Sequence, residues 1–306
     1  MKDFAVEKLR NVCLMSHGGA GKTTLAEAML FNTGVLDRFG KVADGTTTTD
    51  YDPEEIKRKI SISAAIAPCE WKDCKINVID TPGYFDFVGE VKQGIRVAEG
   101  SLILVSAKSG VAVGTEKAWA YSKEQGISKM FFINKMDDEN ADFNKVLNQL
   151  TDTFGKGVIA FQLPIIENEK FTGFIDVINM TAKKFEKDKL ADIPVPSSMN
   201  SKIAEIRDAL NEAIAETDEQ LMEKFFGGEE FTHEEIVKGI MLGVSDGSIA
   251  PVFCGSAMNN LGVQFVMDAI LEYLPAPNFK KTIKALKAGT DTEIELRTAP
   301  DEALSA

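Results

Sequence analysis

The sequence has few cysteines and histidines and no long apolar run. Zinc sites need several sulfur and nitrogen ligands at close spacing, and the two histidines and scattered cysteines do not supply them. The pattern predicts reduced cytosolic thiols. The N-terminus lacks an apolar signal core, and no apolar run reaches about 18 residues, the length that indicates a membrane span. The four cysteines, none in a Cys-x-x-Cys pair, are Cys13, Cys69, Cys74 and Cys254.

Basic residues are also in the minority, with 34 Lys and Arg against 47 Asp and Glu and a net charge of −13. Such a balance repels polyphosphate backbones, so it argues against nonspecific nucleic-acid binding by this segment. It leaves open a local basic site or a partner that contains RNA. The chain is 44% apolar over 306 residues, enough for a sizeable core in one large domain or two modest ones.

Short apolar strands alternate with helices in the first half of the chain. Strands are predicted at 11–15, 75–79, 102–106 and 130–133, and helices at 25–34 and 114–126. This rhythm predicts an α/β fold, in which a doubly wound, mostly parallel sheet is covered by helices on both faces in three layers.

The rhythm changes after about residue 155. Residues 171–186 alternate like antiparallel strands, 191–200 read as a proline-bearing loop, and 201–226 and 231–247 read as helices. Thr232 and Glu235 have capping-box spacing at the start of the second helix. A strand and a helix over 251–274 resume the α/β pattern. Residues 278–306 turn polar and are expected to begin a linker, in a fragment of a longer protein.

The first motif, SHGGAGKT, lies between a predicted strand and a helix, which is the context of a phosphate-binding loop. Its glycines let backbone N–H groups face phosphate oxygens, and the helix N-terminus adds its dipole. Lys22 can reach the β- and γ-phosphates, and the Thr23 hydroxyl can ligate Mg²⁺. The alternative is an ordinary glycine-rich turn, because the first position is serine where glycine is common. The predicted binding residues are Ser16, His17, Gly18, Gly19, Ala20, Gly21, Lys22, Thr23 and Thr24.

The second motif is Asp80-Thr81-Pro82-Gly83, at the end of the apolar strand INVID. The Asp80 carboxylate could hold Mg²⁺ through water, and the Gly83 N–H could approach a γ-phosphate closely. A simple strand-terminating turn is the alternative, but the position after the phosphate loop favours function.

The third and fourth motifs predict which nucleotide base the site binds. Asp137 in Asn134-Lys135-Met136-Asp137 could accept hydrogen bonds from N1–H and the 2-amino group of guanine, and the stem of Lys135 could cover the purine ring. In Ser256-Ala257 a backbone N–H could meet the guanine O6. Each motif alone also suits a polar loop. Together, in this order and at strand C-termini, the four motifs predict GTP or GDP bound with Mg²⁺.

A segment that senses the γ-phosphate is expected between the first helix and the Asp80 strand, at about 40–65. The run DGTTTTD in it has the composition of a low-complexity loop, and its four threonines are expected to be solvated.

The motifs GGAGKTT, DGTTTTDYDPEE, DTPGYFDFVGEV, NKMD, FTGFIDVI and CGSA resemble elongation factor G, a ribosome-dependent translational GTPase. The resemblance runs from about residue 10 to 277. It implies a GTP-binding domain at 1–154 and 251–277 with an inserted α+β subdomain at 155–250, while a β-barrel and smaller domains are missing. It also implies a cytoplasmic, monomeric factor for the large-subunit factor-binding site, with ribosomal RNA as its only nucleic acid. The acidic helix of the insertion is either a docking surface for the ribosomal stalk protein or a solvated face.

Three positions differ from the elongation factor G pattern. Ser61 replaces a threonine yet keeps a hydroxyl for Mg²⁺, and Gly19 replaces an aspartate. Tyr84 replaces the histidine that orients the attacking water, and tyrosine cannot become cationic. The expected catalytic residues are Tyr84, Gly83 and Lys22, with Thr23, Ser61 and Asp80 around the metal. The expected function is GTP hydrolysis by a divergent paralogue, slow without ribosomes. The alternatives are a nucleotide-gated switch with little turnover and a ribosome-protection factor.

Overall fold

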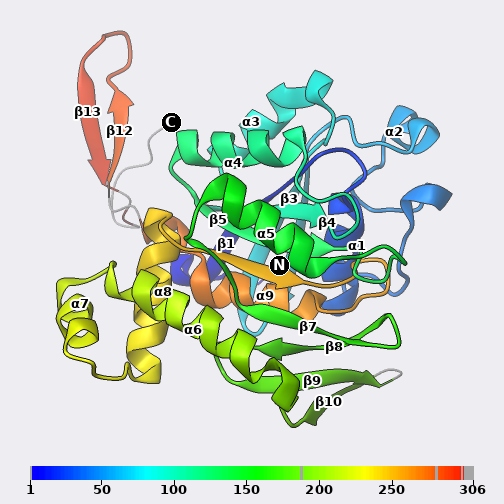
Figure 1. The fold of residues 1–306 in the computed structure, drawn as a ribbon. Coiled ribbons are helices and arrows are strands. Elements are labelled where there is room, and N and C mark those ends of the chain that lie inside the picture. The colour runs from blue at the N-terminus through cyan, green and yellow to red at the C-terminus, as the bar shows by residue number, and fades with distance from the viewer. Residues whose placement is uncertain (1, 187–188, 280–281, 298, 300–306) are drawn as a thin grey trace.

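The computed structural model describes residues 2–186, 189–279, 282–297 and 299 (Figure 1). Its main sheet has seven strands in the order β2-β3-β1-β4-β5-β11-β6. The β2 strand is antiparallel to β3, and the other neighbouring pairs are parallel. The strands are β1 (Leu9–Met15), β2 (Ala65–Trp71), β3 (Cys74–Asp80), β4 (Gly100–Ser106), β5 (Ser128–Asn134), β6 (Val158–Ala160) and β11 (Ala250–Cys254).

Helices cover both faces of this sheet. Val12 and Leu14 of β1 belong to the buried cluster that also contains residues of α1, α8 and α9, whereas Cys13 and Met15 belong to the cluster with α3, α4 and α5. This alternation confirms the predicted three-layer α/β fold. The helices are α1 (Lys22–Asn32), α3 (Val88–Arg96), α4 (Val113–Gln125), α5 (Phe143–Phe154), α8 (His233–Asp246) and α9 (Val263–Tyr273), and the short α2 (Pro53–Arg58) precedes β2.

A second, antiparallel sheet has the strand order β10-β9-β8-β7. Its strands are β7 (Gln162–Glu167), β8 (Lys170–Asp176), β9 (Thr181–Glu186) and β10 (Lys189–Ile193), and α6 (Asn200–Ala215) and α7 (Glu219–Phe226) follow it. Residues 191–193, predicted as loop, belong to β10. The predicted helix 201–226 is two helices, because the Asp218 side chain accepts the Gln220 N–H and begins α7.

The β6 strand and α8, which both lie within the range 155–250, contact the main domain. The β6 strand pairs with β11, and α8 packs on β5, β11 and α9. The apolar face of α8, with Ile240 and Val244 fully buried, explains this placement. Within the predicted range 155–250, the segment from β7 to α7 forms the second sheet and the two helices that follow it.

Part of the range 278–306, which is predicted to begin a linker, forms the hairpin of β12 (Thr282–Leu286) and β13 (Glu293–Arg297), which projects from the main domain (Figure 1). Its strands alternate apolar and polar residues, a pattern typical of strands. Gly289 adopts a positive φ of 74° in the turn between them.

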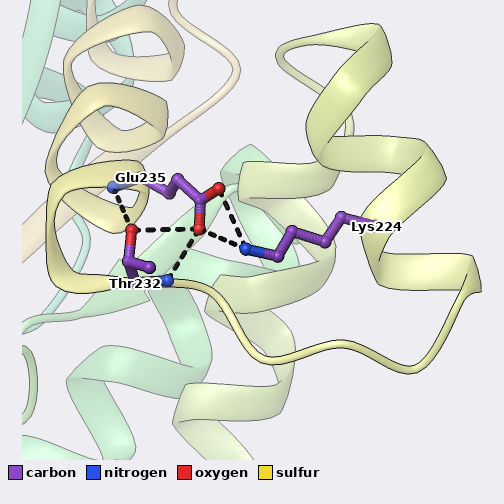
Figure 2. Close-up of polar contacts among 3 residues, drawn as sticks. All are labelled: Lys224, Thr232 and Glu235. Atoms are coloured by element: carbon purple, nitrogen blue, oxygen red, sulfur yellow. Dashed lines mark hydrogen bonds and ion pairs between the residues drawn. The ribbon is translucent and has the colours of Figure 1, made fainter.

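Figure 2 shows the contact that joins α7 to the start of α8. The predicted capping box is present: Glu235 N–H donates to Thr232 Oγ1 over 3.3 Å, and Thr232 N–H donates to Glu235 Oε2 over 2.7 Å. Lys224 Nζ donates to both carboxylate oxygens of Glu235 at 2.8 and 3.0 Å. The bond from Lys224, followed by that from the Thr232 backbone, lowers the pKa of Glu235 to about 2.

All four cysteines are free thiols. Burial raises the pKa of Cys13 and of Cys69 to about 12 and that of Cys254 as well. Among the helices of the described residues, none has the length and apolarity needed to cross a membrane.

Candidate nucleotide site

The four motifs meet at one edge of the main sheet. The phosphate loop follows β1, Asp80 ends β3, Asn134 ends β5, and Ser256 lies two residues after β11. These strands run parallel in the main sheet, so their carboxyl ends lie along the same edge.

The phosphate loop requires glycine at two positions. Gly19 and Gly21 have φ values of 79° and 101°, in the left-handed region that residues with a Cβ rarely adopt. A Cβ on Gly21 would also lie 2.4 Å from Asn134 Nδ2. Thr24 lies with Lys22 and Thr23 in the first turn of α1, so the nine predicted residues form one loop and helix start.

The Asp80 motif packs directly on this loop. A Cβ on Gly83 would lie 2.6 Å from Lys22 Nζ and 2.8 Å from Gly18 Cα, so only glycine fits. Lys22 is buried and donates from Nζ to Ser16 Oγ over 3.0 Å. Thr81 Oγ1 donates to the Leu14 carbonyl over 2.6 Å and fixes the motif, with its buried Pro82, to β1.

The three predicted metal ligands lie together. Thr23 Oγ1 and Ser61 Oγ are 3.1 Å apart, and Asp80 Oδ2 accepts a bond from Thr49 Oγ1 over 2.8 Å. Within the described part of the chain, the other oxygen of Asp80 and the Oδ1 of Asp50 are buried without a hydrogen-bond partner. Two hydroxyls and two carboxylates with unused lone pairs are hard oxygen donors, so these residues fit Mg²⁺.

Burial dominates the electrostatics of this cluster. It raises the pKa of Asp80 to about 6, although Lys22 and the hydroxyls of Thr23 and Thr49 oppose the shift. Burial also raises the pKa of Asp50 and lowers that of Lys22. Each group is held where its charged form is poorly solvated, and a polyanion with a divalent cation would supply the missing counter-charges.

The residues predicted to contact the base form a second group. Asn134 is buried and joins two loops, because its Nδ2 donates to the Ala20 carbonyl over 2.8 Å and its Oδ1 accepts the Ala257 N–H over 2.9 Å. Lys135 has a left-handed φ of 64°, and Asp137 after it is exposed. The structure thus connects the phosphate loop, the Asn134 motif and the Ser256-Ala257 motif.

Tyr84 lies against the phosphate loop. A Cβ on Gly18 would be 3.1 Å from its ring, while 47% of the residue stays exposed. Beside this loop His17 Nδ1 is buried without a hydrogen-bond partner among the described residues, and burial, followed by Lys22 and Lys135, lowers its pKa. Tyr84 is therefore placed near the phosphates that the loop would bind, and its catalytic role stays a prediction.

Several residues around the predicted metal ligands were not predicted from the sequence. Thr47 and Thr49 are buried, so the expectation of four solvated threonines is wrong for these two, while Thr46 and Thr48 are exposed. Asp50 beside them is 4% exposed. Neither the polar composition of this run nor its four identical threonines signalled which of its side chains would be buried.

Two buried glutamates hold this segment in place. Glu27 accepts the N–H groups of Gly40 and Thr48, and Glu55 accepts those of Ile62 and Ser63 beside Ser61. These bonds position the backbone on both sides of Asp50. Sequence reasoning could not find them, because each contact joins a helix to a loop backbone whose path the sequence does not reveal.

The fold and the loop geometry define a P-loop nucleotide-binding domain. The family model described as the elongation factor Tu GTP binding domain matches residues 7–276. The chain therefore belongs to this family of translational GTPases, whose domain binds GTP.

A solved structure is also similar to this chain. A crystal structure of a protein from Thermus thermophilus matches with a TM-score of 0.85 and 38% sequence identity. The match covers 89% of this chain and 41% of that one, so this chain spans less than half of its relative.

Proposed function

We propose that this chain is the GTP-binding and hydrolysing domain of an elongation factor G-like translational GTPase that acts in translocation or a related ribosomal step. The observation that carries the proposal is the β7–α7 insertion between the Asn134 motif and the Ser256-Ala257 motif. Elongation factor G, which the motifs resemble, has an inserted subdomain at this place.

In this proposal, separate groups of residues bind the phosphates, the base and the metal. Lys22 and the loop amides bind the phosphates, and Asp137 and the Ala257 N–H read guanine. Thr23, Ser61 and Asp80, with Asp50 beside them, would hold Mg²⁺, which when bound neutralises charge on the phosphate oxygens. Gly83 admits the γ-phosphate closely, and the Tyr84 hydroxyl donates a hydrogen bond to the attacking water or the γ-phosphate.

The proposed partner is the ribosome, at the factor-binding site of the large subunit, and the factor is cytoplasmic and monomeric. The exposed face of α6 and α7 supports a contact with a basic surface of the stalk protein, because its charged side chains are mostly acidic. The exposed acidic residues are Glu205, Asp208, Glu212, Glu216, Glu219 and Glu223.

The test measures GTP turnover by the purified protein with and without ribosomes. We expect slow turnover alone and a large increase with ribosomes. A ribosome-independent rate, high or low, would contradict the proposal.

Tyr84 and Gly19 favour one alternative, a nucleotide-gated switch with little turnover. The signature of such a switch is GTP-dependent binding to ribosomes without stimulated hydrolysis. A ribosome-protection factor, a further alternative, would displace tetracycline from ribosomes in a GTP-dependent manner.

A further inference from the structure

Asn259 touches the predicted base-reading carboxylate. It lies in the loop between β11 and α9, and its Nδ2 donates to Asp137 Oδ2 over 2.9 Å. Both residues are exposed, so burial does not force the contact. Asn259 belongs to none of the four motifs.

The backbone under Asn259 is fixed from within its own loop. Ser256 and Leu261 exchange two backbone hydrogen bonds, each of 2.9 Å, and the Asn259 N–H donates to Ser256 Oγ over 3.2 Å. The Ala257 N–H is bound to Asn134 in addition. The Asn259 side chain therefore starts from a defined backbone position.

The same loop is also attached to α1. Asn260 and Asn32 exchange two side-chain hydrogen bonds, of 2.6 and 3.0 Å, and Gln264 Nε2 donates to Asn32 Oδ1 over 3.1 Å. Asn260 adopts a left-handed φ of 54°, which asparagine tolerates better than most residues. The helix that begins with Lys22 thus holds the far side of the Asn259 loop.

We propose that Asn259 is a positioning residue that orients the Asp137 carboxylate for guanine. The χ2 torsion of an exposed aspartate is broad, so without a partner the carboxylate samples many planes. Guanine offers N1–H and the 2-amino group side by side and needs both oxygens in one plane. The Asn259 Nδ2–H group occupies one lone pair of Asp137 Oδ2 and leaves the remaining acceptor sites for the base. The proposal rests on the assignment of Asp137 as the base-reading residue.

The first test compares GDP with inosine diphosphate, which lacks the 2-amino group, by titration calorimetry. Asn259→Ala should weaken GDP binding about tenfold, the worth of roughly one hydrogen bond to a charged group. Inosine diphosphate, with one donor, should lose less, so the preference for GDP falls. Met258→Ala, a change of an exposed neighbour in the same loop, should leave both affinities unchanged. An unchanged preference in Asn259→Ala overturns the proposal.

Two further variants separate positioning from general loop stability. Asn259→Asp keeps the side-chain size but replaces the donor by a like charge beside Asp137, so it should weaken GDP more than Asn259→Ala does. In an Asp137→Ala background, Asn259→Ala should add nothing, and additive losses would show that Asn259 acts elsewhere. If Asp137→Ala itself leaves GDP binding intact, the base-reading assignment is what fails.

Discussion

A carboxylate at the nucleotide edge and a carboxylate at the junction of α7 with α8 have opposite environments. Asp80 is buried, one of its carboxylate oxygens has no hydrogen-bond partner among the described residues, and its pKa is raised to about 6. Glu235 is partly exposed, its carboxylate is partnered by Lys224 and Thr232, and its pKa is lowered to about 2. The first arrangement costs folding free energy, and the second contributes it.

This difference indicates that the first region binds a ligand and that the second stabilises the fold. Groups held in unfavourable environments concentrate at functional sites, where a ligand supplies the missing interactions. We therefore expect changes at the nucleotide edge to alter binding or turnover more than stability, and changes at Glu235 to alter stability alone.

The largest effect is expected at Tyr84. If water positioning limits the rate, Tyr84→His should raise ribosome-stimulated kcat by about 10²–10³-fold, typical of one positioned group. Nucleotide affinity and the urea midpoint should stay unchanged. The measurement is single-turnover hydrolysis on ribosomes. Tyr84→Ala is the companion variant: a fall in its rate shows that the phenol acts, and no change in either variant shows that Tyr84 only packs.

At the base, Asp137→Asn replaces a pair of acceptors by one acceptor and one donor. It should cost guanine binding on the order of 3 kcal/mol, the worth of about two hydrogen bonds to a charged group. Xanthosine nucleotides, with a carbonyl in place of the amine, should be preferred. Competition between GTP and XTP measures this change of nucleotide preference. A retained preference for GTP would show that Asp137 does not contact the base.

Thr23→Ala should make nucleotide binding less responsive to Mg²⁺, by about tenfold, because one hard oxygen donor is lost. Lys22→Ala should instead weaken GDP and GTP together. Titrations with Mg²⁺ and with EDTA separate the two effects. Thr48→Ala, at an exposed threonine of the neighbouring loop, is the matched control. An unchanged Mg²⁺ response in Thr23→Ala would contradict its metal role.

The Asp80→Asn variant tests the cost of the buried charge. Because the folded pKa of about 6 lies above the ordinary 3.8, the native state holds the proton more tightly than the unfolded chain. The free energy of unfolding should fall as pH rises from about 4 to about 6. At pH 8 and without nucleotide, Asp80→Asn should be more stable than the wild type by about 1–3 kcal/mol, and the difference should vanish near pH 4. Urea titrations measure this. A less stable variant at pH 8 would mean that the contacts with Lys22 and Thr49 outweigh burial.

The smallest effect is expected at Glu235. Its folded pKa of about 2 lies below the ordinary 4.5, so its stabilising contribution is present above about pH 4.5 and is lost as pH falls toward 2. Glu235→Gln should lower the urea midpoint modestly at pH 7 and converge with the wild type near pH 2. Glu234→Gln, at the adjacent exposed position, should change little. A pH-independent difference would point to lost packing instead of charge.

The main fold was predictable because its signals are local. Buried parallel strands such as β4 read as apolar runs, and the helices between them show amphipathic spacing or capping residues. The predictions failed where strands are short or lie outside the main core. Residues 191–193 precede two prolines and resemble a loop, and only antiparallel pairing with β9 makes them a strand.

The site was predictable as far as its motifs extend. The structure brings the four motifs to one edge, although the roles of their residues stay predictions. Asp50 and Asn259 could not be found, because their importance depends on the nearby carboxylates of Asp80 and Asp137, which no local pattern connects to them. The polar composition of the DGTTTTD run predicts a solvated loop, and only the fold shows that part of it packs beside Asp80.

The placement of β6 and α8 has a consequence for the nucleotide site. The chain enters the insertion from β6 and returns through α8, and both elements contact β11. The β11 strand leads directly toward Ser256 and Ala257, which are the proposed contacts of the base and not of the phosphates. Through β11 the insertion is therefore connected more directly to the proposed guanine contacts than to the phosphate loop.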